Sequence, residues 1–432
     1  MPPVASGAEP GENRARLLEL SATLFASQGY AQVSLRQLAA ELGVSTGAIY
    51  SNFRNKAALL AEVLGARVLE DMERSQRSRP GQWLPDVVRE SFLRMPERAE
   101  MRSLLLEAGA AARTDTELRE RVRPTLKALI DQWIEDYRAW QTFAHVDPEI
   151  DMGAVVTVLW ASELGIGVLE AQDAVRAEPE WLAEVIGGYL ESLAGGGDQA
   201  PTFDPLPAPT AARATDPTDS TKLGLADESA TRERLIDAAI ELFAERGYAT
   251  STVRDLARST GVTTGSIYGN FDSKATLLVA AIEARLDRDL EDLPAASGEP
   301  VSPGGLIMFH VNRFDLRARL RALLIEGAAA ARSEPDVHER LRAVSLRHEE
   351  RWVAECTSRL ATPTASSAQE VGRFVTLVWC TELGLGLLEA FDLPVPDSRT
   401  IGTLLLQLFQ RSGSELFAAS AAPTASGEQA RP

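Results

Sequence analysis

The chain has 432 residues, of which 45% are hydrophobic and 25% are charged, and its formal net charge is −18 at pH 7. This composition is typical of a folded, soluble protein, and the length exceeds what one hydrophobic core supports, so we expect several domains. The negative charge excludes a general attraction to nucleic acid or anionic membranes, so any phosphate contact needs a local surface of opposite sign. Cys356 and Cys380 are the only cysteines. They exclude a disulfide framework, and with no apparent signal or spanning segment we expect a cytoplasmic protein.

Two nearly identical segments show that the sequence is internally duplicated. GVSTGAIYSNF begins at Gly43 and GVTTGSIYGNF begins at Gly261, an offset of 218 residues. At an offset of 219, LLLEAGAAAR from Leu104 matches LLIEGAAAAR from Leu323. A repeat of this length far exceeds the roughly 20 to 50 residues of solenoid units, so each copy is expected to fold by itself.

The first helix of each copy is predicted from apolar residues at helical spacing. Leu17, Leu24 and Phe25 share one face before Gly29, where a left-handed cap suits glycine, and the second copy repeats the pattern before Gly247. The spacing throughout both copies is helical, which predicts an all-α fold.

Two short helices follow in each copy. The first is predicted to start at an N-cap, Ser34 or Thr252, and to end at Gly43 or Gly261. The second is predicted to be capped by Ser45 or Thr263. Short helices joined by a tight turn form a helix-turn-helix, whose second helix enters the major groove of DNA.

The residue types of the second short helix suit contact with DNA. Gly47 and Gly265 allow a close approach of the backbone, and small or hydroxylated side chains that meet base edges and thymine methyl groups follow at Thr46, Ala48, Thr264 and Ser266. Groups able to donate to phosphate are Tyr50, Asn52, Lys56, Tyr268, Asn270 and Lys274. Helical hairpins also occur in proteins without DNA-binding activity, so the full pattern, present twice, carries this interpretation.

Both copies resemble the N-terminal DNA-binding region of TetR/AcrR-type transcriptional repressors. The resemblance rests on the first helices at 14–30 and 232–248, and on SLRQLAAELGVSTGAIYSNFRNKAALL and TVRDLARSTGVTTGSIYGNFDSKATLL, about a quarter of the chain. It implies that DNA is faced by Ser34, Arg36, Ser45, Thr46, Gly47, Ala48, Tyr50 and Lys56, and by Thr252, Arg254, Thr263, Thr264, Gly265, Ser266, Tyr268 and Lys274. Asn52 and Asn270 stand where the family commonly has histidine.

The resemblance also implies an effector-binding and dimerisation domain in the rest of each copy. Candidate residues of a pairing interface are Trp160, Glu163, Gly167, Glu170, Trp379, Glu382, Gly386 and Glu389, of which the glutamates and glycines share one helical stripe. The alternative is that the glutamates face solvent. Tryptophans that line an effector pocket or simply belong to the core are Trp83, Trp133, Trp140, Trp160, Trp181, Trp352 and Trp379.

We therefore predict two TetR-like units in one chain, with no cofactor and no bound metal. The expected domains are 12–58 and 229–276 for DNA binding, 59–194 and 277–418 for effector binding and dimerisation, and 195–228 as a flexible linker rich in Pro, Gly and Thr. The expected partners are an operator in double-stranded DNA and an unidentified small-molecule effector, with the two repeats pairing inside the chain and a higher oligomer still open.

Two other function classes were weighed. An enzyme is disfavoured, because the four histidines have neither metal spacing nor a nearby nucleophile, and no phosphate-cradling glycine loop is present. An interaction or ligand-sequestering protein with one inactive head stays open. The local charge of the two heads differs: residues 14–60 carry five bases and two acids, whereas residues 232–278 carry six of each. The second head is therefore expected to bind DNA more weakly than the first.

Overall fold

The computed structural model describes residues 10–77, 83–174, 178–195, 228–291, 303–360 and 367–411. In these ranges every regular element is a helix, which confirms the all-α prediction. The first repeat comprises α1 (Pro10–Gln28), α2 (Leu35–Leu42), α3 (Thr46–Tyr50), α4 (Lys56–Arg77), α5 (Leu84–Leu93), the 3-10 helix η1 (Met95–Arg98), α6 (Ala99–Ala112), α7 (Thr116–Phe143), α8 (Met152–Glu170) and α9 (Pro179–Ala194).

The second repeat has the same order of elements. It comprises α10 (Glu228–Arg246), α11 (Val253–Thr260), α12 (Thr264–Asn270), α13 (Lys274–Glu291), α14 (Pro303–Val311), η2 (Asp315–Arg317), α15 (Ala318–Ser333), α16 (Pro335–Ser358), α17 (Ser367–Ala390) and α18 (Ser398–Arg411). The predicted linker lies outside the described residues except for Gly195 and Glu228. The helices α4 and α13 run without a break across the expected domain boundaries at 58 and 276.

The caps of the short helices are those predicted. Ser34 Oγ accepts the Gln37 N–H at 3.1 Å, and Gly43 ends α2 with a φ of 69°. In the second repeat Thr252 and Asp255 form a reciprocal capping box. The hydroxyls of Ser45 and Thr263 cap α3 and α12.

A small hydrophobic core holds each recognition helix. Phe25, Leu38, Ile49 and Phe53 are at most 1% exposed, and burial of a side chain such as Ile49 contributes roughly 1.5 to 3 kcal/mol. Because one face of α3 is fixed in this way, the opposite face is presented to solvent.

The centre of the molecule is the packing of α8 against α17. Both helices are long and apolar enough to span a membrane. However, 94% of the apolar 18-residue stretch in α8 and 89% of that in α17 are buried inside the protein. Their apolar character is explained by this position, because α8 and α17 form the most extensive contact between the two repeats.

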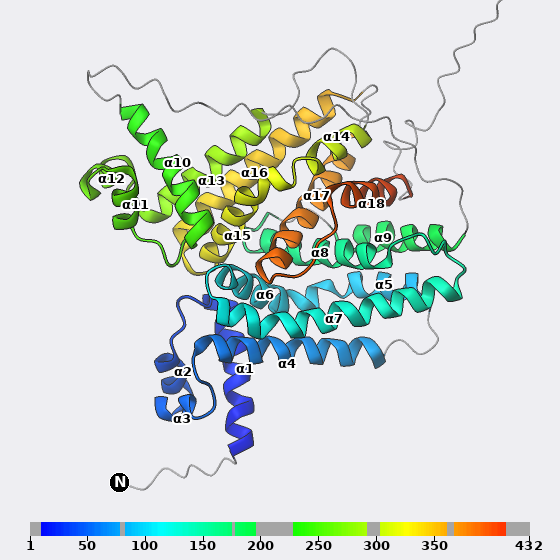
Figure 1. Ribbon diagram of the computed structural model, residues 1–432, viewed down its shortest axis with the longest axis horizontal. Coiled ribbons are helices and arrows are strands. Elements are labelled where there is room, and N and C mark those ends of the chain that lie inside the picture. The colour runs from blue at the N-terminus through cyan, green and yellow to red at the C-terminus, as the bar shows by residue number, and fades with distance from the viewer. Residues whose placement is uncertain are drawn as a thin grey trace, which may run out of the picture.

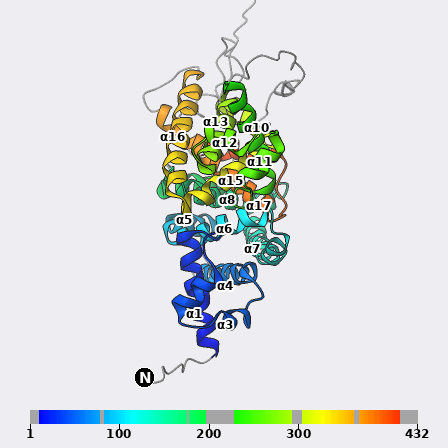
Figure 2. The same ribbon diagram turned by 90° about the vertical axis from the view of Figure 1, so that its left-hand side faces the viewer.

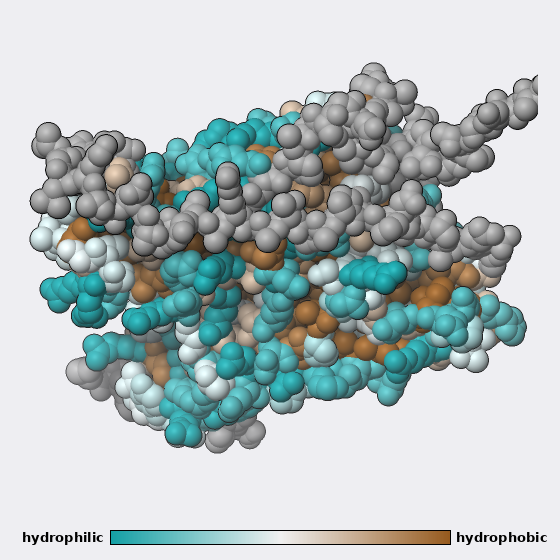
Figure 3. Space-filling view, turned by 45° about the horizontal axis from the view of Figure 1, so that its top comes forward, coloured by the Kyte–Doolittle hydropathy of each residue, from teal (hydrophilic) through white to brown (hydrophobic). Residues whose placement is uncertain are grey.

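The two helix-turn-helix units lie on the same side of the molecule. In Figure 1 the first head, with α2 and α3, is at the lower left and the second, with α11 and α12, is at the upper left. Figure 2 turns this side toward the viewer, with the first head below the second. In Figure 3 this end of the surface is mostly hydrophilic, whereas hydrophobic surface gathers over the C-terminal domains to the right.

Candidate nucleic-acid interface

The outer face of each recognition helix carries an exposed tyrosine. Tyr50 is 57% exposed and Tyr268 is 56% exposed, which is unusual for such large side chains in a helical domain. A methyl group on Gly47 or on Gly265 would meet only the capping hydroxyl of Ser45 or Thr263, at 3.6 and 3.7 Å. Packing inside the protein therefore leaves room for a side chain at these glycines, so a requirement for glycine there comes from an external partner.

The other candidates lie around these tyrosines on the same surface. In the first head a groove of 540 Å³ is lined by five of them together, Ser34, Arg36, Thr46, Tyr50 and Lys56. The exposed candidates outside the groove are Ser45, Gly47, Ala48 and Asn52, and in the second head Thr252, Arg254, Thr263, Thr264, Gly265 and Tyr268. Ser266, Asn270 and Lys274 are partly buried.

The two lysines have a role that the sequence did not predict. Lys56 Nζ donates to the carbonyls of Tyr30 and Val33 at 2.7 and 3.0 Å, and Lys274 Nζ donates to those of Tyr248 and Ser251 at 2.8 and 3.1 Å. Burial lowers the pKa of both ammonium groups. Each ammonium thus ties the start of α4 or α13 to the turn that precedes α2 or α11. A contact of Lys56 or Lys274 to phosphate stays a prediction.

The asparagines are partly committed as well. Asn52 Nδ2 donates to the carbonyl of Ala48 at 2.9 Å, and Asn270 Nδ2 donates to that of Ser266 at 2.8 Å. Asn52 Nδ2 also lies 3.4 Å from Ser51 Oγ. An amide nitrogen carries two protons, so Asn270 keeps one for a phosphate, whereas Asn52 gives up its longer bond to Ser51 to do so.

The predicted pairing stripe contacts helices of its own repeat and not the other repeat. Glu163 pairs with Arg98 at 2.5 Å and Glu170 pairs with Arg102, both within the first repeat. A methyl group on Gly167 would lie 2.8 Å from Cβ of Arg102. In the second repeat Arg321 approaches Glu382, Gly386 and Glu389 in the same way. This stripe therefore joins α8 to α6 and α17 to α15. Glu163 and Glu382 are buried, whereas Glu170 is partly exposed and Glu389 is exposed.

The contact between repeats uses the opposite face of α8 and α17. A methyl group on Gly165 would collide with the carbonyl oxygen of Cys380, and one on Gly384 would collide with that of Ala161. Ser162 Oγ lies 2.8 Å from Thr381 Oγ1. Each contact pairs residues that are equivalent or reciprocal in the two repeats, as in an isologous dimer interface. Gly165 precedes Gly167 by two residues, which is about 200° around a helix, so the two glycines face different partners.

Two buried glutamates that the sequence analysis did not single out connect the heads to this centre. Glu107 accepts the N–H of Tyr30 at 2.7 Å, and Glu326 accepts the N–H of Tyr248 at 2.7 Å. Burial raises the pKa of both carboxyls to about 7, against the lowering effect of the Tyr N–H groups and of nearby Arg332 or Arg113. A single glutamate in an otherwise apolar run, LLLEAGAAAR and LLIEGAAAAR, is the signal that would have revealed them.

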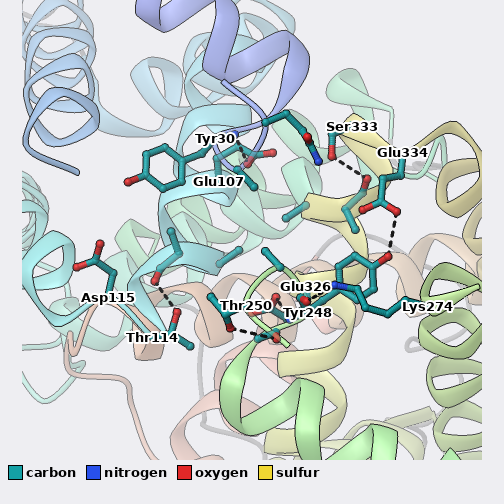
Figure 4. Close-up of a pocket in the computed structure, with 18 residues that line it drawn as sticks. Tyr30, Glu107, Thr114, Asp115, Tyr248, Thr250, Lys274, Glu326, Ser333 and Glu334 are labelled. Carbon is teal, nitrogen blue, oxygen red and sulfur yellow. Dashed lines mark hydrogen bonds between the residues drawn. The ribbon is translucent and has the colours of Figure 1, made fainter. Parts of the chain in front are cut away.

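A hollow of 430 Å³ separates the two heads above these glutamates. Its lining is nearly symmetric: Tyr30, Glu107, Thr114 and Asp115 of the first repeat correspond to Tyr248, Glu326, Ser333 and Glu334 of the second. In Figure 4 the side chains of Tyr30, Glu107, Thr114 and Asp115 lie to the left of those of Tyr248, Lys274 and Glu334. The hollow thus lies between the repeats and belongs to both.

The tryptophans are core residues. Trp140, Trp160, Trp352 and Trp379 are buried, and Trp83, Trp133 and Trp181 pack partly buried against the same core. In the described part of the chain no cluster of His, Cys, Asp or Glu has the arrangement of a metal site. One buried histidine is specific to the second repeat: His310 lies 2.7 Å from Glu382 and contacts Arg317, whereas the equivalent pair Glu163 and Arg98 of the first repeat has Ser91 at the position of the histidine.

Comparisons with known proteins point to one family. The family model described as bacterial regulatory proteins, tetR family, matches residues 17–63 and 235–281. The chain is 33% identical over 193 residues to the HTH-type transcriptional repressor AcnR of Corynebacterium glutamicum, an alignment that covers 45% of this chain and 88% of the relative. It is 38% identical over 97 residues to the HTH-type transcriptional repressor KstR2 of Rhodococcus jostii, 22% of this chain and 41% of the relative.

The chain spans less than half the length of several relatives, among them KstR2 at 41% and two Pseudomonas putida regulators, SrpR at 28% and TtgW at 45%. A crystal structure of a TetR-family regulator from Rhodococcus sp. is 20% identical with a TM-score of 0.38, over 43% of this chain and 99% of that chain.

Proposed function

The chain belongs to the TetR family of bacterial regulatory proteins, and from this premise we propose that it represses transcription by binding one operator with both heads of a single chain. Its two repeats take the place of the two subunits of a homodimer. The observation that carries the proposal is the isologous α8 and α17 contact, because it leaves both recognition helices on one side of the molecule (Figure 2).

The arrangement suits a helix-turn-helix reader. Such readers place two recognition helices in major grooves about 34 to 36 Å apart, and a single module of this size gives little selectivity. Tethering also favours pairing within the chain, since a linker of this kind gives an effective concentration on the order of millimolar. The exposed face of α3 and α12 contributes the base contacts and, through Tyr50 and Tyr268, contacts to phosphate. Arg36 on α2 and Arg254 on α11 add further contacts to phosphate.

Relief of repression by a small molecule completes the proposed mechanism. Because α4 and α13 each begin in a head and end in a C-terminal domain, a ligand between the C-terminal helices that displaces them also moves the heads. Such a ligand acts by favouring a head spacing that fits adjacent grooves poorly. Buried His310 has no counterpart in the first repeat, where Ser91 stands, so the two domains differ in the ligands that they accept.

The stoichiometry on DNA tests this function. Duplexes are selected from a random 40-base-pair library with the purified chain, and the mass of the complex is measured by light scattering. One chain per selected duplex, with both halves protected from cleavage, supports the proposal. Two chains on a palindromic duplex would mean that heads of the same type pair across chains.

The alternative with one inactive head is tested on the same duplex. The surplus of bases in the first head predicts that Tyr50→Ala weakens binding more than Tyr268→Ala, while both weaken it. A Tyr268→Ala protein that binds as tightly as the unmodified chain would establish the alternative.

A further inference from the structure

Each head is attached to its own C-terminal domain by a buried carboxylate. The N–H groups of Tyr30 and Tyr248 follow the glycine that ends the first helix of each head, and they donate to Glu107 and Glu326. Glu107 is 4% exposed and Glu326 is 5% exposed. The position of each carboxylate therefore bears directly on the turn that leads into the helix-turn-helix.

An arginine of the other repeat reaches the same carboxylate. Nε of Arg332 lies 3.3 Å from Glu107 Oε1, and Nε of Arg113 lies 3.4 Å from Glu326 Oε1. These four residues form two equivalent ion pairs across the repeats, which we call the crossed pairs. Arg113 also donates to the carbonyl of Ala244, in the last turn of the second head's first helix.

The crossed pairs lie where apolar packing between the heads is lacking. The hollow of 430 Å³ leaves a gap between the turns at Tyr30 and Tyr248, so side chains do not hold these turns at a set distance. The arginine side chains are only 19% and 14% exposed. At such burial an ion pair is weakly screened, and the desolvation of both charges offsets much of its gain in stability while its geometry stays restrictive.

We propose that Arg113 and Arg332 are positioning residues that set the distance between the two recognition helices, and hence the spacing of half-sites that the chain accepts. The part concerning half-sites rests on the proposed function, because spacing matters only when both heads bind one operator. The part concerning the distance between heads holds for the free protein.

The distance is measured without DNA by pulsed electron spin resonance. Nitroxide labels are attached at Glu41→Cys and Ser259→Cys, equivalent exposed positions on α2 and α11. The native thiols are buried, and burial raises the pKa of Cys356 to about 12, so they resist labelling. We expect R113Q/R332Q to broaden the distribution of distances at least about twofold, because the crossed pairs then no longer restrain the turns at Tyr30 and Tyr248.

A matched control is available in the same molecule. Arg373 pairs with Glu178 at 2.9 Å, also an Arg–Glu contact between repeats but joining the C-terminal domains. R373Q is expected to leave the distribution unchanged. If R113Q/R332Q unfolds, E107Q/E326Q breaks the same two ion pairs from the carboxylate side, with side chains of equal size. A distribution as narrow as that of the unmodified chain in either folded double variant would overturn the proposal.

A second measurement separates this proposal from the proposed function. Duplexes selected with the unmodified chain are lengthened or shortened by one or two base pairs between the halves. We expect R113Q/R332Q to tolerate these changes better than R373Q does. If the distances broaden but binding does not depend on half-site spacing, Arg113 and Arg332 do position the heads. The proposal that both heads bind one operator is then contradicted.

Discussion

Among single residues, Lys56 and Arg36 lie in the same groove but differ in what their charges contact. Lys56 is bound to carbonyls of its own head, whereas Arg36 is exposed. We expect Lys56→Met to destabilise the protein by about 1 to 3 kcal/mol, because the carbonyls lose a buried donor. The salt dependence of DNA binding separates the two roles. Arg36→Ala should lower its slope by about 0.9, the value for one phosphate contact, and Lys56→Met by much less. Equal slopes for the two variants would mean that Lys56 contacts a phosphate as Arg36 does.

Glu107 and Glu326 give the stability of the fold a dependence on pH. Their pKa values are raised to about 7 in the folded chain, mainly by burial, so between pH 4.5 and about 7 each holds a proton that an ordinary glutamate has released. The carboxylates of the crossed pairs are charged above about pH 7, where the distances between the heads are to be measured. The groups that face Glu107 are Arg332, Lys56 and Glu326, and those that face Glu326 are Arg113 and Lys274. Their contribution is therefore fully present below pH 4.5 and is lost as the pH rises through about 7.

This reasoning predicts the behaviour of E107Q/E326Q. Between pH 5 and 7 the unmodified chain should lose about 1 kcal/mol per carboxyl and pH unit relative to the double variant. Urea unfolding at several pH values measures the difference, with Glu120→Gln, at an exposed glutamate, as the control. A difference that stays constant over this range would show that neither carboxyl carries the extra proton.

At the scale of elements, Gly165 and Gly384 decide how closely α8 approaches α17. We expect Gly165→Ala to destabilise the chain by about 1 to 3 kcal/mol, because the added methyl group displaces backbone rather than a flexible side chain. Gly65, in the middle of α4, has open space at its Cβ position. Gly65→Ala should therefore be neutral or stabilising by up to about 1 kcal/mol. Chemical unfolding of both variants is the measurement, and similar effects at both positions would contradict the tight contact.

The same elements show how far the sequence predicts the structure. Local signals sufficed for the heads, because a cap such as Ser34 or Gly43 acts on backbone within a few residues. They did not suffice for α8, which is buried on every side, so that the stripes containing Gly165 and Gly167 look alike in the sequence. Which stripe meets the other repeat depends on where Arg102 lies in space. The crossed pairs were missed for the same reason, since they join residues more than 200 positions apart.

At the scale of the whole molecule, duplication frees the two heads from being identical. A homodimer reads both halves of its operator with one sequence, whereas α3 and α12 have diverged within a shared structure. The segments from Gly43 and Gly261 differ only at Ser45 and Thr263, Ala48 and Ser266, and Ser51 and Gly269. All six positions lie on or beside the recognition helices, so we expect an operator with similar but unequal halves.

Making the recognition helices alike should make the operator symmetric. The variant T263S/S266A/G269S gives the second head the eleven residues of the first, from Gly261 to Phe271. Selection from random DNA with this variant should return a palindrome built from one half of the original operator, and the reciprocal variant S45T/A48S/S51G should return a palindrome built from the other half. Because both variants keep the caps and the buried Ile49 and Ile267, a change in the selected sequence reflects contact and not unfolding. If both variants select the original unequal halves, the differences between the two heads do not read bases, and the asymmetry of the operator must come from outside α3 and α12.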